Sequence, residues 1–177
     1  YLVIRNALTL EQVTELNQAI DLVYEQQNAE DRLAREGKLN LRNCIIHYDA
    51  FLQLLDIPTA TPLAGKILNW NIQMITTHLI VLSPSKDPDD NVKYKIGLHR
   101  DGGTSHNEMQ EPHLRILLKT AYALSDQTGP ASVATVLVPG SNHLLGYPSI
   151  DPETGGARGA ISMDVNAGDA FVFEQRA

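Results

Sequence analysis

Residues 97–103 read GLHRDGG and place a histidine and an aspartate two positions apart, directly after an apolar segment. In an extended backbone, residues i and i+2 project to the same side, so the side chains of His99 and Asp101 converge while Arg100 faces away. An imidazole nitrogen and a carboxylate oxygen suit Fe(II), and His-x-Asp supplies two ligands of a 2-His-1-carboxylate facial triad. The alternative is a hydrogen-bonded surface pair without a metal. The sequence around this stretch favours the metal site.

The composition is that of an ordinary folded protein. A chain of 177 residues, 43% hydrophobic and 20% charged, is long enough for one domain with a substantial core and argues against disorder. The net charge of −7 disfavours a surface for nucleic acid or anionic lipid, so we expect neither as a partner. Cys44 is the only cysteine, which excludes an intrachain disulfide and a cysteine-based zinc site.

The sequence contains no apolar run near the length of about 18 residues that suggests a transmembrane helix, and no signal-peptide pattern. We therefore expect a cytoplasmic protein with no membrane partner. The sequence begins at Tyr1 inside an apolar segment and ends at Ala177 directly after another one. We expect residues 1–177 to be a single domain that is truncated at both ends. The composition leaves the oligomeric state open.

The first part of the chain predicts a short strand over residues 1–5 and then a helix. Thr9 and Gln12 fit a capping box at the start of this helix. Apolar residues follow at helical spacing, and they are Leu10, Val13, Leu16, Ile20 and Val23 or Tyr24. Residues 26–43 are charged and weakly periodic, which we interpret as a helix end followed by a loop.

The next part predicts a helical turn over residues 50–55 and a second helix that runs to about Trp70. Thr61 is its expected N-cap, because a proline follows at the first helical position. Residues 71–83 are β-branched and alternating, which predicts a strand.

Short strand-like segments separated by long loops fill the second half. They lie at residues 92–98, 114–124, 134–138, 160–165 and 170–173, and a tight turn over residues 166–169 precedes the last one. The even positions of segment 114–124 form an almost wholly apolar face, whereas the odd positions combine small residues with Arg115 and Lys119 and can line a cavity. Helices followed by a run of short strands predict an α+β fold, mainly β, with an antiparallel sandwich or barrel.

Five segments, in this order, resemble enzymes of the phytanoyl-CoA dioxygenase (PhyH) type, which are Fe(II)/2-oxoglutarate-dependent oxygenases. The segments are YLVIRNALTLEQV at the start, HRDGG at 99–103, LLKTAYALSD at 117–126, VLVPGSNH at 136–143 and AGDAFVFEQRA at 167–177. The resemblance implies a double-stranded β-helix, a jelly-roll, cupin-like barrel flanked by N-terminal helices, which agrees with the predicted order of elements.

The resemblance implies that His99 and Asp101 are the first two iron ligands. In the family, a distal histidine follows the strand that corresponds to residues 168–173, so the third ligand is expected just beyond Ala177. The arginine that binds 2-oxoglutarate is expected further on. The sequence as given is therefore expected to hold iron poorly and to be inactive. Related halogenases replace the aspartate with alanine or glycine, so Asp101 favours hydroxylation or desaturation.

The resemblance and the strand pattern also suggest ligand-binding residues. We expect Lys119 and Ser83 to bind the cosubstrate and Thr104, His106 and Arg115 to contact substrate. The alternative for Lys119 is a lysine that extends its amino group to solvent at the rim of the barrel.

Three further residues are interpreted as structural. His143 belongs to a turn near the site and is not expected to be a ligand. His78 is expected to be a hydrogen-bonded histidine of the core, with a pocket-lining position as the alternative. Arg176 is expected to stabilise the fold.

Together these features predict an Fe(II)- and 2-oxoglutarate-dependent dioxygenase that uses O2 to hydroxylate a small-molecule substrate, releasing succinate and CO2. The alternative is a non-catalytic jelly-roll module that acts in binding or as a scaffold. A cupin-like metal isomerase would need two or three clustered histidines, which residues 99–101 lack. The acidic composition disfavours a CoA ester as substrate, because its phosphates usually need a basic surface.

Overall fold

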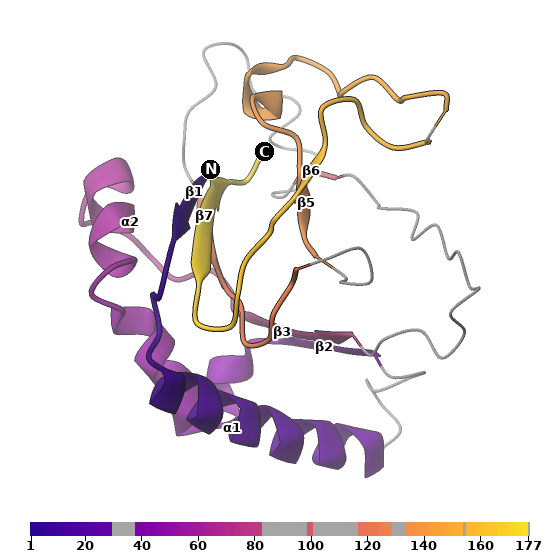
Figure 1. Ribbon diagram of the computed structural model, residues 1–177. Helices are drawn as coiled ribbons and strands as arrows, with labels where there is room; N and C mark the ends of the chain where they lie inside the picture. The colour runs from indigo at the N-terminus through magenta and orange to yellow at the C-terminus, as the bar shows by residue number, and fades with distance from the viewer. Residues whose placement is uncertain (30–37, 83–98, 101–116, 129–133, 154, 177) are drawn as a thin grey trace.

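The computed structural model describes residues 1–29, 38–82, 99–100, 117–128, 134–153 and 155–176. Figure 1 shows a long helix, α1 (Leu10–Ala29), lying along one side of the molecule, with short strands on the other side of the core that it covers.

The start of α1 is the predicted capping box. The Gln12 backbone N–H donates to Thr9 Oγ1 (3.1 Å), and the Thr9 backbone N–H donates to Gln12 Oε1 (2.9 Å). This reciprocal pairing satisfies two donors that a helix start leaves unpaired. The buried face of the helix carries Val13, Leu16, Ile20 and Val23. The prediction of this helix is confirmed, except that Leu10 is 80% exposed and lies outside the buried face.

The strands β2 (Lys38–Arg42) and β3 (His78–Leu82) form an antiparallel pair. Successive side chains of a strand point to opposite faces. The face that packs on α1 carries the buried residues Leu39, Leu41 and Leu79. The opposite face of β3 is exposed, with Ile80 58% and Leu82 40% accessible.

Two expectations for this region need correction. In residues 26–43 the predicted helix end is confirmed, because α1 continues to Ala29, but residues 38–42 form the strand β2 and not a loop. Two alternating leucines are too short a pattern to indicate a strand before its distant partner is known. The predicted strand 71–83 is also too long, since residues 71–77 form no regular element. A β-branched segment becomes a strand only where a neighbour supplies ladder hydrogen bonds.

Two 3-10 helices, η1 (Cys44–Ile46) and η2 (Asp49–Asp56), precede the helix α2 (Thr61–Leu68). The prediction of α2 is confirmed, but its N-cap is Ala60 and not Thr61. The Thr61 hydroxyl donates instead to the Leu55 carbonyl (3.0 Å), which joins α2 to the end of η2.

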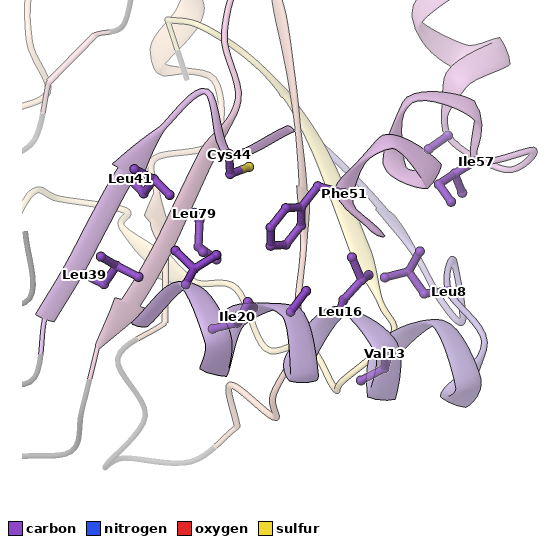
Figure 2. Close-up of a cluster of buried hydrophobic side chains, with 13 residues drawn as sticks. Leu8, Val13, Leu16, Ile20, Leu39, Leu41, Cys44, Phe51, Ile57 and Leu79 are labelled. Atoms are coloured by element: carbon purple, nitrogen blue, oxygen red, sulfur yellow. The ribbon is translucent and has the colours of Figure 1, made fainter. Parts of the chain in front are cut away.

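These elements enclose a hydrophobic core between α1, the β2–β3 pair and η2, shown in Figure 2. The labelled side chains are Leu8, Val13, Leu16, Ile20, Leu39, Leu41, Cys44, Phe51, Ile57 and Leu79. Phe51 is only 1% exposed and meets the ring of Tyr48 edge to face, with 6.5 Å between the ring centroids. Burying one such large side chain stabilises the fold by about 1.5–3 kcal/mol, so this core fixes α1 in place.

A three-stranded antiparallel sheet has β7 (Ala170–Glu174) at its centre, between β1 (Leu2–Ile4) and β4 (Leu118–Tyr122). The sheet separates two cores. One face carries Ile4 and Tyr122, which pack on the core beneath α1. The other face carries Phe171, which belongs to a second core.

The second core lies between this sheet and the antiparallel pair β5 (Val136–Leu137) and β6 (Ile161–Ser162). Its buried members are Ala123, Leu137, Met163, Val165 and Phe171. A short 3-10 helix, η3 (Ser141–His143), follows β5. Both β5 and β6 are shorter than the predicted strands 134–138 and 160–165.

A tight turn over residues 166–169 leads into β7, as the sequence predicts. Gly168 has a φ of 91°, and an added Cβ would lie 3.0 Å from the Leu8 carbonyl oxygen, so the turn requires glycine. The Leu8 backbone N–H donates to the Gly168 carbonyl (2.9 Å), which attaches the turn to the segment before α1.

The described residues form an α+β structure with small antiparallel sheets, and they do not include a closed barrel. The predicted strand 92–98 lies outside the described residues, as does the beginning of the predicted strand 114–124. None of the helices in the described ranges has the length and apolar character needed to span a bilayer. A single domain over residues 1–177 stays a prediction.

Candidate metal centre

Arg100 connects the predicted ligand motif to the loop after β5. Its Nη2 atom donates to the carbonyl oxygens of Ser141 (3.1 Å), Leu144 (2.9 Å) and Gly146 (2.6 Å). Its guanidinium also lies over the ring of Tyr147, 5.4 Å from the centroid, within the range of a cation–π contact. We refer to residues 141–147 as the carbonyl loop, because its backbone oxygens converge on this side chain.

The end of β7 reaches the same loop, as Figure 1 shows near the C-terminus. Arg176 is 3% exposed, and its Nη2 atom donates to the Leu144 carbonyl (3.0 Å) that Arg100 also binds. The Arg176 carbonyl accepts a bond from the Ser141 hydroxyl (3.3 Å). The motif at residues 99–100 and the end of β7 therefore meet at one loop, although they are distant in sequence.

The two arginines place two positive charges close together. Burial, and next the nearby charge of Arg176, hold the pKa of Arg100 below its ordinary value, while Tyr147 acts in the opposite direction. The Nε and Nη1 atoms of Arg176 are buried and lack a hydrogen-bond partner among the residues that the structure describes. Two guanidinium groups therefore lie close together at the carbonyl loop.

A second polar contact joins the carbonyl loop to β7. The Asn142 side-chain amide donates to Glu174 Oε2 (2.9 Å) and lies 3.4 Å from His143 Nε2. His143 is exposed within η3. Its position in a turn beside the ligand motif agrees with the interpretation from the sequence, and its exclusion as a ligand stays a prediction.

The structure places only part of the predicted site. His99 is described and its side chain is exposed. The other predicted positions lie outside the described residues, and they are Ser83, Asp101, Thr104, His106 and Arg115. Within the described ranges, no three side chains of His, Cys, Asp or Glu stand close enough to hold a metal ion.

Lys119 lies on the predicted side of its strand. In the register of β4 and β7, Lys119 is opposite Phe173, on the face that also carries Ala121 and the second core. Leu118 and Thr120 alternate to the other face. The predicted separation of the two faces of this strand therefore holds over residues 118–122, and the role of Lys119 in binding stays a prediction.

His78 differs from its expected position. It begins β3 opposite Arg42, on the face directed away from Leu79 and the first core, and it is exposed. The interpretation as a core histidine is therefore wrong. Its buried neighbour Leu79 points to the opposite face, whereas Ile80 and Leu82 share the face of His78 and are exposed with it.

The sequence did not indicate the part that Arg100 plays. The alternation of side chains along an extended backbone places the Arg100 side chain only on the side away from His99. Its partners there are backbone carbonyls, which every residue type has, so the sequence cannot identify them. The available signal was indirect: the segment VPGSN predicts a turn whose carbonyls need donors. Arg176 is buried and bonded to the loop, which agrees with a structural role.

A largely apolar pocket of about 230 Å3 lies beside the carbonyl loop, between α2, the start of β1 and the end of β7. Its lining comprises Tyr1, Leu2, Leu63, Ile67, Leu118, Leu137, Val138, Pro139, Gly140, Asn142, Val172, Phe173 and Glu174. Asn142 and Glu174 form its polar side. Of the predicted site residues that the structure describes, neither His99 nor Lys119 lines it.

Comparison with known proteins agrees with the resemblance seen in the sequence. The model of one protein family, described as Phytanoyl-CoA dioxygenase (PhyH), matches residues 1–177. The comparison with curated proteins gives no match. The family match covers all five segments quoted above, including the ligand motif and the strand that ends at Arg176.

Proposed function

Because the chain belongs to the phytanoyl-CoA dioxygenase (PhyH) family, we propose that it is an Fe(II)- and 2-oxoglutarate-dependent dioxygenase that hydroxylates a small molecule, with release of succinate and CO2. Membership implies Fe(II)/2-oxoglutarate-dependent oxygenase activity in general. The observation that carries the proposal is the meeting of residues 99–100 with the end of β7 at the carbonyl loop, through Arg100 and Arg176.

The donor types support an iron site. His99 offers an imidazole nitrogen from an exposed side chain, and Asp101 offers a carboxylate two positions later. A 2-His-1-carboxylate set with open positions is typical of non-haem Fe(II) oxygenases, and a further histidine beyond Ala177 is the proposed third ligand. Bound iron with 2-oxoglutarate and O2 supplies the oxidising chemistry, and the protein supplies binding and orientation.

The sheets support a barrel as the proposed complete fold. The β1–β7–β4 sheet and the β5–β6 pair both contribute to the second core, so they lie on two sides of one apolar interior. Two facing antiparallel sheets are the basis of a jelly roll. We propose that they are walls of a double-stranded β-helix.

Lys119 is the described candidate for contact with the cosubstrate. It lies on the interior face of β4 opposite Phe173, where an ammonium group can pair with a carboxylate of 2-oxoglutarate. Ser83 is proposed to add a polar contact to the cosubstrate, and Thr104, His106 and Arg115 are proposed to contact substrate.

The test is anaerobic addition of Fe(II) and 2-oxoglutarate to the full-length protein. We expect a visible metal-to-ligand charge-transfer band, and succinate formation after exposure to air. His99→Ala and Asp101→Ala should lose the band, because each removes one iron ligand. Matched controls are His47→Ala and Asp164→Ala, which change exposed side chains and should keep it.

Two results would contradict the proposal. A wild-type protein that gives neither the band nor succinate is not an oxygenase, and the non-catalytic binding or scaffold module would then be preferred. A band that persists in both His99→Ala and Asp101→Ala would place the iron site elsewhere.

A further inference from the structure

Arg100 stands between the two predicted iron ligands and is bound to the carbonyl loop. The two N–H bonds of its Nη2 atom are directed at three carbonyl oxygens, at 2.6 to 3.1 Å. Its guanidinium plane also contacts the Tyr147 ring. The side chain is thus held both by hydrogen bonds and by an aromatic face.

Arg100 and Arg176 in turn bind backbone oxygens of the carbonyl loop that lie outside regular structure. Leu144 and Gly146 follow η3 and belong to no helix or strand. Among the described residues, their carbonyl oxygens accept hydrogen bonds only from Arg100 and Arg176. Both residues are exposed, so water can bond to either carbonyl in place of the arginine, but separate water molecules do not hold the oxygens on one atom. Loss of the arginine should therefore release this part of the loop.

We propose that Arg100 is a positioning residue that holds the backbone of the ligand His99 against the carbonyl loop. The inference rests on the proposed function, because it requires His99 to bind iron. Arg100 is joined to His99 by a peptide bond, so fixing its side chain restricts the backbone from which His99 projects. Groups that orient metal ligands from outside the coordination sphere change metal affinity by about 10–100-fold.

The test compares Arg100→Ala and Arg100→Lys with wild type in the full-length protein. We measure the Fe(II) dissociation constant of the folded fraction by anaerobic titration. Arg100→Ala should bind Fe(II) about tenfold more weakly. Arg100→Lys should lose less, because an ammonium group still donates to carbonyls but lacks the planar face that stacks on Tyr147. Arg158→Ala removes an exposed arginine and should match wild type.

Amide hydrogen exchange gives a readout that does not involve iron. In the metal-free protein, amides of residues 144–147 should exchange faster in Arg100→Ala than in wild type, and Arg100→Lys should fall between them. Tyr147→Ala removes the ring beneath the guanidinium and leaves the carbonyls. It should weaken Fe(II) binding less than Arg100→Ala does. If Arg100→Ala does not fold, weaker Fe(II) binding in Tyr147→Ala supports the role of Arg100, and unchanged binding contradicts it.

The outcomes separate this inference from the proposed function. If wild type binds no Fe(II), the proposed function fails and the inference fails with it. If wild type binds Fe(II) and the Arg100 and Tyr147 variants bind it equally tightly, only the role of Arg100 is overturned. An equal loss in Arg100→Ala and Arg158→Ala also overturns it, since general charge would then explain the effect.

Discussion

Asp169 shows how one buried charge can join distant parts of the chain. Its side chain is 3% exposed and accepts bonds from Arg5 Nη1 (2.6 Å) and from the backbone N–H groups of Asn6 and Asn166 (both 2.9 Å). Burial alone raises the pKa of Asp169, but the bonds from Asn166, Asn6 and Arg5 outweigh it, so the pKa lies below its ordinary value. The carboxylate therefore joins the end of β1 to the turn before β7.

Asp169→Asn should lower the free energy of unfolding by about 1.5–3 kcal/mol at neutral pH, because hydrogen bonds to a charged group are lost. The folded-state pKa is depressed, so the contribution of the carboxylate is fully present above the unfolded value of about 3.9 and is lost as the pH falls through the folded value. Urea unfolding between pH 7 and pH 3 measures the difference from wild type.

The control for this prediction is Asp164→Asn, which changes an exposed carboxylate near the same turn and should have little effect. A difference between wild type and Asp169→Asn that stays constant from pH 7 to pH 3 would contradict the role given to the charge. The sequence predicts the turn at residues 166–169, but it does not reveal a partner as remote as Arg5, because tertiary ion pairs follow no fixed spacing.

At the scale of single elements, the capping box of α1 gives a local prediction. Thr9→Ala should lower the free energy of unfolding by about 1 kcal/mol, because the Gln12 backbone N–H loses its acceptor. Thr14→Ala is the matched control. The Thr14 hydroxyl bonds to the Leu10 carbonyl within the helix (2.8 Å), and alanine favours a helix, so this change should be neutral or slightly stabilising. Equal losses in the two variants, measured by urea unfolding, would show that the cap has no special role.

Elements that carry local signals could be predicted from the sequence, whereas those that depend on a partner could not. The capping box of α1 and the glycine turn before β7 follow from residue type and short spacing. By contrast, β2 exists because β3 pairs with it, and residues 71–77 stay outside a strand in spite of their β-branched residues. The N-cap of α2 was misassigned because the Thr61 hydroxyl bonds to Leu55 in the preceding element.

At the scale of the whole molecule, the candidate site also combines features that the sequence predicts with contacts between distant segments that it does not predict. The residue types indicate the ligand motif, and the resemblance to the PhyH family implies the strand after which a third ligand is expected. The sequence does not show that they meet at the carbonyl loop. That meeting depends on Arg100 and Arg176 binding one backbone oxygen, that of Leu144, and any residue type can supply such an oxygen.

The central strand β7 should make the two cores unfold together. Phe171 is 1% exposed and stacks on Phe173, with 5.8 Å between ring centroids. Phe171→Ala should therefore cost about 3–5 kcal/mol. Because β7 pairs with both β1 and β4, and the turn before it binds Leu8 at the edge of the first core, the loss should extend to both cores.

Two probes test this coupling. Far-UV circular dichroism follows the helices and strands, and the fluorescence of Trp70, the single tryptophan, follows the end of α2, remote from Phe171 in sequence. In Phe171→Ala both unfolding curves should shift to lower urea by the same amount, as a two-state transition requires. Leu145→Ala, at a side chain that is 79% exposed, should leave both curves unchanged. A Trp70 transition that stays at the wild-type midpoint while the dichroism shifts would mean that the end of α2 unfolds independently of β7, and it would contradict the coupling.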